Sequence, residues 1–292
     1  MNMKKEYTTK EIQNSILSIV KDFDIFCREN EIEYYLMGGS ALGAMRHKGF
    51  IPWDDDLDVF MTVPNYKIFL STFENATQED IRYKQYFLQK ENTKEWPLFL
   101  SRVCLNGTTM ISDEFKYNMK QHHTVFLDVM CLYSAPGNDV KRWFQYMAAQ
   151  LLRVNALALC NFPNKSVIKR MALRLSKIMV NPVTKPFLIK YVNRYEGQDT
   201  ELVGHYFGRA RFRRTSFLRR YLGVKPRYVP FEDAQLPVFE NVEEYLTARF
   251  GEKWMEMPSQ EIKDQYPIHG NFVDLENNYT HYMSEDGKSW IY

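Results

Sequence analysis

The feature that most restricts how this chain can fold is an acidic run, Trp53–Asp58 (WDDDLD), that leads directly into apolar residues. Side chains alternate between the two faces of a strand, so Asp56 and Asp58 should point the same way while Leu57 packs on the other side. Two carboxylates on one face repel each other unless a cation lies between them. Oxygen ligands at this spacing suit Mg²⁺ or Mn²⁺, which also bind substrate phosphates. The alternative is a solvated acidic turn, but a buried strand next to it favours the metal site.

A glycine turn precedes this run. Tyr34–Met37 predicts a short strand, Gly38 and Gly39 a tight turn, and Ser40 the cap of a short helix over Ala41–Arg46. Glycines let backbone amides approach a phosphate group, and a helix N-terminus favours negative charge. Many such turns bind nothing, but upstream of an acidic strand this one predicts a phosphate cradle that faces a metal site.

A third carboxylate, Asp128, lies at the centre of an apolar strand predicted over Thr124–Leu132. A buried carboxylate is costly unless it is paired or bound to metal. Asp128 is therefore a candidate third metal ligand or general base for an acceptor hydroxyl, and the alternative is an Asp satisfied by backbone groups or an Arg. Four basic residues in the loop after the glycines and in another predicted strand are candidate phosphate contacts or plain surface charge: Arg46, His47, Lys48 and Arg102.

The rest of the chain predicts a mixture of helices and strands, which indicates an α/β or α+β fold. The four cysteines, Cys27, Cys104, Cys131 and Cys160, have neither metal-site nor disulfide spacing and are expected to be reduced and buried. Neither a signal peptide nor a membrane span is predicted, so we expect a cytoplasmic protein. The further elements expected are helices over Lys10–Glu31, Asn65–Phe73 and Glu240–Arg249, and strands over Leu57–Met61, Tyr83–Leu88 and Leu98–Leu105.

Charge is distributed unevenly along the chain. Val140–Phe231 contains 19 Lys and Arg but three acidic residues, a net charge of +16; because the whole chain carries +2, the remainder carries −14. Within it, Ser166–Val180 predicts a helix with an apolar stripe edged by cations, as in helices that lie on membrane surfaces. A basic helical subdomain packed on the core and an anionic membrane surface are both compatible with this pattern. Nucleic acid is an unlikely partner, because no recognised binding module is present.

The residues Met37–Val59 together resemble the signature of the LicD family, which includes bacterial phosphocholine transferases, is related to the fukutin-type transferases and belongs to the nucleotidyltransferase-fold superfamily. A weaker similarity covers Phe231–Pro258. The resemblance implies an α+β fold: a nucleotidyltransferase-like mixed sheet flanked by helices, with an inserted basic helical segment. The implied division is a catalytic core over 1–138, a basic helical insertion over 139–227, and a segment over 228–292 that completes the core.

The resemblance also implies a reaction. Asp56, Asp58 and Asp128 would bind Mg²⁺ or Mn²⁺, and Gly39 and Ser40 would hold the phosphates of a CDP-activated alcohol such as CDP-choline. The acceptor would be a cell-surface glycan or teichoic-acid precursor, including lipid-linked ones, and the enzyme would be cytoplasmic or peripheral on the inner face of the membrane. Further candidate substrate contacts are Trp53, Asp55, Glu232 and His269.

Two competing functions remain open at this point. A true nucleotidyltransferase would use the same metals and phosphate cradle to attack the α-phosphorus of an NTP and would release pyrophosphate. An inactive, lipid-docking scaffold of glycan assembly would need neither metal nor nucleotide, and the complete set of carboxylates speaks against it.

Overall fold

The computed structural model describes residues 6–266 and 268–291. The expectation that the N-terminus is not a signal peptide partly concerns residues 1–5, which lie outside the described residues. Its centre is a mixed sheet in the order β1-β2-β6-β4-β3, in which β2 and β6 are parallel and the other neighbours antiparallel. The predicted α+β class is confirmed. The strands are β1 Tyr35–Leu36, β2 Asp58–Thr62, β3 Tyr86–Gln89, β4 Ser101–Leu105 and β6 Phe126–Ala135.

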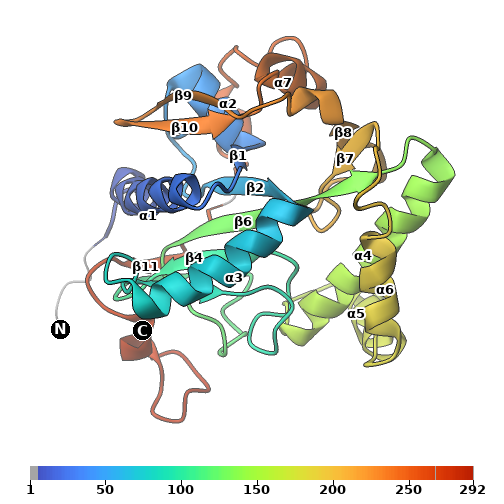
Figure 1. The fold of residues 1–292 in the computed structure, drawn as a ribbon. Coiled ribbons are helices and arrows are strands. Elements are labelled where there is room, and N and C mark those ends of the chain that lie inside the picture. The colour runs from blue at the N-terminus through green and yellow to red at the C-terminus, as the bar shows by residue number, and fades with distance from the viewer. Residues whose placement is uncertain (1–5, 267, 292) are drawn as a thin grey trace.

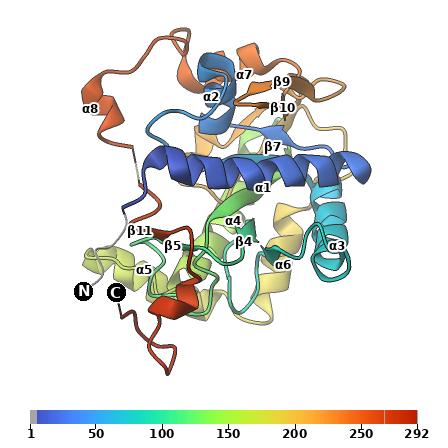
Figure 2. The same cartoon turned by 90° about the vertical axis from the view of Figure 1, so that its left-hand side faces the viewer.

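Helices α1 (Thr9–Glu29) and α3 (Val63–Glu79) pack together against one face of this sheet, and Figure 2 shows α1 lying across it. Thr8 and Glu11 form a reciprocal capping box that begins α1. The two helices meet through edge-to-face aromatic pairs, Phe23 with Phe69 at 5.3 Å and Phe26 with Phe73 at 4.9 Å between ring centroids. This aromatic core leaves the other face of the sheet for the site.

Three helices stand together at one end of the molecule (Figure 1): α4 (Asp139–Leu159), α5 (Val167–Met179) and α6 (Thr184–Val192). The buried side chain of Gln145 joins them to the sheet, because its amide donates to the carbonyl oxygens of Ser134 at 2.9 Å and Val192 at 2.7 Å. After α6 the chain returns to extend the sheet with β7 (Leu202–Gly204) beside β6, and β8 (Ser216–Leu218) beside β7. Among the described residues, no helix combines the length and apolarity that crossing a bilayer requires.

The C-terminal segment closes over the first third of the chain. Strands β9 (Arg227–Phe231) and β10 (Ala234–Val238) form a hairpin beside α2 (Gly39–His47) and β1, followed by α7 (Val242–Phe250) and α8 (Gln260–Lys263). Strand β11 (Phe272–Asp274) then pairs with β5 (Thr109–Ile111). Short 3-10 helices cover Phe212–Arg214, Arg219–Tyr221 and Tyr279–Tyr282.

The structure corrects some local predictions. Helix α2 begins at Gly39 after Gly38, whose φ of +63° suits glycine, and Ser40 does not cap it. Strands β3 and β4 are shorter than expected because the residues before them form turns, and α3 extends beyond Asn65–Phe73 at both ends. The four cysteines are buried and free, as predicted. The division into 1–138, 139–227 and 228–292 stays a prediction.

Candidate active site

Two aspartates of the predicted metal set are direct neighbours in the sheet. Asp58 is the first residue of β2 and lies beside Asp128 of β6 in parallel register. On β4, Arg102 faces Asp128, while the adjacent Ser101 forms a 2.8 Å hydrogen bond with Tyr66 of α3. Because neighbouring side chains on a strand point to opposite faces, Arg102 and Asp128 lie on the face away from α3.

That face opens into a cavity of about 1050 Å³. Asp56, Asp58, Asp128 and His269 are in its wall, together with Arg102. Asp56 precedes β2 rather than lying within it, so the strand alternation expected for Asp56 and Asp58 does not apply, but both residues line the same cavity. The three predicted metal ligands are therefore brought together.

Arg102 is fixed in place by its surroundings. Its Nε donates to Asp128 Oδ1 at 2.8 Å, and both side chains are about nine-tenths buried. The guanidinium also stacks over Phe126, 3.6 Å from the ring centroid, and over Trp96, at 4.4 Å. One oxygen of Asp128 is thus paired with an arginine, as one of the alternatives for this residue predicted. The Asp128 side chain nevertheless lines the cavity.

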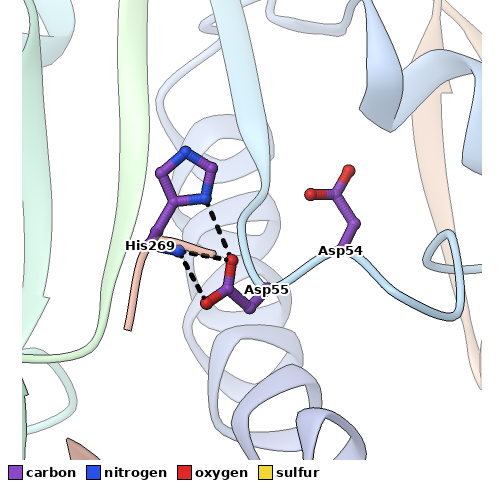
Figure 3. Close-up of side chains that lie close together, drawn as sticks. All are labelled: Asp54, Asp55 and His269. Carbon is purple, nitrogen blue, oxygen red and sulfur yellow. Dashed lines mark hydrogen bonds and ion pairs between the residues drawn. The ribbon is translucent and has the colours of Figure 1, made fainter. Parts of the chain in front are cut away.

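Asp55 and His269, 214 positions apart in sequence, are joined by several hydrogen bonds (Figure 3). The Asp55 carboxylate accepts from the backbone N–H groups of His269 and Gly270, at 2.8–3.0 Å, and from His269 Nδ1 at 3.0 Å. The other ring nitrogen, Nε2, lies 3.4 Å from Asp56 Oδ2. Asp55 therefore holds His269 so that its free nitrogen points to Asp56.

This contact changes the pKa of both residues. Burial alone would lower the pKa of His269, but the hydrogen bond to Asp55 and the charge of Asp56 outweigh it and raise the pKa to about 9. Burial alone would raise the pKa of Asp55, but the hydrogen bonds from His269 and Gly270 outweigh it and lower the pKa. The pair is thus an imidazolium against a carboxylate near neutral pH.

The remaining carboxyl groups repel one another. Burial and then the charge of Asp56 raise the pKa of Asp54 to about 8, and a hydrogen bond between these two side chains raises it as well. Burial, followed by the charges of Asp56 and Asp128, raises the pKa of Asp58 well above its usual value. Buried carboxyl groups of this kind are stabilised by a cation.

The residues present fit a divalent metal ion. Five carboxyl groups, those of Asp54, Asp55, Asp56, Asp58 and Asp128, lie close together, and burial with their mutual repulsion raises the pKa of Asp54 and Asp58, the situation that a bound cation relieves. Within the described part of the chain, the tightest group of possible ligands is Asp54, Asp55 and His269, whose ligand atoms lie within 4.8 Å of one another (Figure 3). Because Asp55 and His269 are already hydrogen-bonded to each other, the carboxylate oxygens more available to a metal ion are those of the other aspartates.

The glycine turn supports this site from one side. The Gly38 N–H donates to the Tyr245 hydroxyl at 3.0 Å, and the Asp58 N–H donates to Ser40 Oγ at 2.9 Å. A side chain built at Gly39 would come within 3.5 Å of Asp54 Oδ2, which places the start of α2 next to the carboxylates. Gly38 and Ser40 thus join the turn to α7 and β2, and whether they also hold a phosphate stays a prediction.

Three of the predicted phosphate contacts lie outside the cavity wall. Arg46 donates to the carbonyl oxygens of Trp254 at 3.2 Å and Glu256 at 3.1 Å, and to His47 Nε2 at 3.0 Å. Lys48 ends α2 in the left-handed conformation, with φ of +56°. Arg46 therefore attaches α2 to the segment after α7, while the Lys48 carbonyl oxygen accepts from the Glu232 N–H at 2.7 Å.

Two of the predicted substrate contacts are likewise used for packing. Glu232 bonds to the N–H of Phe50 at 3.3 Å and to Lys10 Nζ at 2.8 Å, which fastens the β9–β10 turn to the loop after α2. Trp53 packs edge-on against Tyr266, and its indole N–H is buried without a hydrogen-bond partner in the described residues. Neither side chain is in the cavity wall.

The structure adds three arginines that the sequence did not single out as site residues: Arg153, Arg209 and Arg249 all line the cavity. Arg209 pairs with Glu114, whereas Arg153 and Arg249 have no acidic partner within the described residues. Arg209 and Arg249 also line a second cavity of about 1080 Å³ that adjoins the first. Arg153 had a sequence signal, since it is the only charged residue between Arg142 and Lys165.

The comparisons with known proteins agree with this geometry. Residues 31–167, which include the neighbouring strands that carry Asp58 and Asp128, match the family model described as "LicD/FKTN/FKRP, nucleotidyltransferase domain". Residues 31–167 of this chain therefore form a domain of the LicD/FKTN/FKRP type.

One relative extends the similarity over nearly the whole length. The lipopolysaccharide cholinephosphotransferase LicD of Haemophilus influenzae is 26% identical over 272 residues, which cover 91% of this chain and 97% of that protein. Uncharacterised proteins of Rickettsia prowazekii and Rickettsia typhi are each 44% identical over 45 residues, 15% of this chain. The family resemblance of the acidic signature is confirmed.

Proposed function

We propose that this protein transfers a phospho-alcohol, with phosphocholine as the first candidate, from a CDP-alcohol to a hydroxyl group of a cell-surface glycan precursor. The observation that carries the proposal is the side-by-side placement of Asp58 and Asp128, with Asp56 and His269, in one cavity. The activity for which the Haemophilus influenzae relative is named supports the choice of phosphocholine and of a lipopolysaccharide-type acceptor. A teichoic-acid precursor is an acceptor of the same chemistry.

In the proposed reaction, the acceptor oxygen attacks the β-phosphorus of the donor. The bond from that phosphorus to the bridging oxygen breaks, and CMP leaves with the oxygen, while the acceptor proton passes to a carboxylate, for which we propose the free oxygen of Asp128. Mg²⁺ or Mn²⁺ held by Asp56 and Asp58 would supply positive charge to the phosphates, and Asp128 would be either a third ligand or the group that takes the proton.

The chain's own residues have distinct proposed tasks. Arg102 fixes the orientation of Asp128, and Asp55 fixes His269 with its protonated ring directed at the carboxylates. Arg153 and Arg249, for which the described residues supply no acidic partner, are proposed to contact the donor diphosphate. The glycine turn with Gly39 and Ser40 remains the second phosphate contact that we propose.

We place the reaction on the cytoplasmic side, with the protein free or peripheral on the inner face of the membrane. Four buried cysteines, all free, support a reducing compartment.

The test is CMP release from a panel of CDP-alcohols with Mg²⁺ and a lipid-linked glycan fraction as acceptor. Wild type is compared with Asp58→Ala and with Asp199→Ala, an exposed aspartate that serves as a matched control. We expect CMP from one donor, lost in Asp58→Ala and kept in Asp199→Ala. Pyrophosphate release from an NTP, with no CMP from any CDP-alcohol, would instead establish nucleotidyl transfer, the reaction after which the matched domain is named.

A further inference from the structure

Helix α5 presents an apolar row to solvent. Ile168, Met171, Leu175 and Ile178, which we call the α5 outer face, follow one another at spacings of three and four residues and are 80%, 64%, 55% and 73% exposed. Residues at such spacings lie on one side of a helix. Past the end of α5, the exposed Val183 and Phe187 add to the apolar surface. A contiguous exposed apolar surface marks an interaction site.

Cations accompany the α5 outer face. Arg170, Arg174 and Lys177 lie along the helix beside it, and none of them makes an ion pair within the described residues. The stretch from Val140 to Tyr195 contains no acidic residue. The positive charge of this surface is therefore not neutralised by its own segment, and it calls for an anionic partner.

The opposite side of the same helix belongs to the catalytic cavity. Lys169, Ala172 and Leu173 are in the cavity wall together with Asp56 and Asp58. Asn155 of α4 donates to the Ser176 carbonyl oxygen at 3.1 Å, which attaches α5 to α4 and so fixes which side faces outward. Whatever binds the α5 outer face is therefore separated from the cavity by this one helix.

We propose that the α5 outer face docks on an anionic lipid bilayer, with its apolar row in the interface and its cations on the headgroups. A helix with this division, apolar on one side and basic beside it, is suited to lie in the plane of a membrane interface. A second copy of the chain fits less well, because it would bring two unneutralised basic rows together. Nucleic acid would leave the apolar row uncovered.

Docking would have a consequence for the substrate, and this part rests on the proposed function. Because α5 also lines the cavity, an acceptor anchored in the same bilayer could present its hydroxyl group to that cavity without leaving the membrane. The substrate class that fits best is thus a lipid-anchored glycan.

Binding is tested by sedimenting the full-length protein with vesicles of phosphatidylcholine alone or mixed with phosphatidylglycerol. The variants are Met171→Glu with Ile178→Glu, and Ile81→Glu as a control at an equally exposed apolar residue, 78% exposed, outside the helical segment. We expect binding to the anionic vesicles only, lost in the α5 double variant and kept in Ile81→Glu. Replacing Arg170 and Arg174 by Gln should weaken binding about 25-fold, at about fivefold for each cation.

Equal and negligible sedimentation with both vesicles, or binding that the double variant retains, would overturn the proposal, and so would tighter binding to duplex RNA than to anionic vesicles. All variants change exposed side chains, and circular dichroism and melting curves would confirm that they fold.

The two proposals fail separately. Asp58→Ala should bind anionic vesicles as wild type does, because it leaves α5 untouched. Vesicle binding without CMP release from any donor would leave docking standing and remove the proposed reaction. If wild type releases CMP, the α5 double variant should release none with a vesicle-anchored acceptor and as much as wild type with a soluble glycan. Equal loss of CMP release with the two acceptors would contradict the proposed lipid-anchored substrate class.

Discussion

At the scale of single residues, Asp55 acts through another side chain. It satisfies two backbone N–H groups and the His269 ring, so the segment around His269 depends on it. In Asp55→Asn the side chain keeps one acceptor oxygen and loses the charge. We expect the pKa of His269 to fall from about 9 toward the ordinary value, measured by NMR of labelled histidine, and CMP release to fall at least tenfold.

An unchanged His269 pKa in Asp55→Asn would show that Asp56 alone sustains the charge of the ring. Asp199→Asn serves as the control, since Asp199 is exposed and far from His269 in sequence.

The buried ion pair between Arg102 and Asp128 makes a prediction about stability. Arg102→Met leaves a buried carboxylate without its partner, and such a change costs about 3–5 kcal/mol of unfolding free energy. Arg82→Met, which removes an exposed bridge to Asp80 and Glu29, should cost under about 1 kcal/mol. Urea denaturation measures both. Similar losses in the two variants would mean that Asp128 is solvated after all.

His123 predicts how stability depends on pH. Its Nε2 bonds the Asn118 carbonyl oxygen at 3.1 Å and its Nδ1 contacts Gln121 Nε2 at 3.0 Å, so the neutral ring fits and the charged ring does not. Burial lowers its pKa to about 3, whereas an unfolded chain has a histidine pKa of about 6.5. Below that pH the unfolded state takes up a proton that the folded state does not, so the unfolding free energy falls as pH falls.

The expected slope from His123 is about 1.4 kcal/mol per pH unit between roughly pH 6.5 and 3, and zero above pH 6.5. In His123→Gln the denaturant-derived stability curve should be flatter by that amount on the acid side. A loss that is equal at every pH would reflect lost packing against Trp290 alone and would contradict the prediction.

At the scale of elements, the close packing of α2 on the loop after it positions the acidic run. A methyl group at Gly43 would lie 2.6 Å from the Gly49 carbonyl oxygen, so Gly43→Ala must push α2 away from residues 49–51. We expect a loss of about 1–3 kcal/mol in unfolding free energy and a loss of CMP release. Gly107→Ala, where φ is +82° and no atom lies within 4 Å, should lower stability through the backbone alone and leave CMP release unchanged.

Sequence patterns predicted most of these elements because hydrophobic periodicity is local. Helix α1, the strand at Asp58 and the strand at Asp128 follow directly from apolar spacing, and the predicted α5 matches within one residue at each end. The cap assigned to Ser40 was wrong, because its hydroxyl is taken by the Asp58 N–H from a strand that begins 18 residues later. Local patterns do not contain such a partner.

At the scale of the whole molecule, the site depends on contacts that no spacing rule gives. The Arg102–Asp128 pair follows from strand register, and Arg153 and Arg249 reach one cavity from α4 and α7. His269 was a candidate through family resemblance alone, and its attachment to Asp55 became visible only in three dimensions. Residue types and charge predicted the carboxylate site, while tertiary packing decided which cationic side chains line the same cavity.

Metal binding should stabilise the whole fold. A ligand that binds the folded state alone adds about 2.7 kcal/mol at one hundred times its dissociation constant. We therefore expect the melting temperature to rise with Mg²⁺ or Mn²⁺ and to return after chelation. Asp58→Asn should abolish the shift, and its metal-free melting temperature should be no lower than that of wild type, since one of several repelling carboxylates is gone. A full shift in Asp58→Asn would place the metal elsewhere.

The bond between Asp55 and His269 also sets an order of events during synthesis. Asp55 leaves the ribosome long before His269, and β5 must wait for β11 to become paired. A nascent chain can build α1, α3 and most of the central sheet early, but its acidic loop stays without its histidine until the segment around His269 has emerged. Catalytic competence should therefore appear only after that segment has been synthesised.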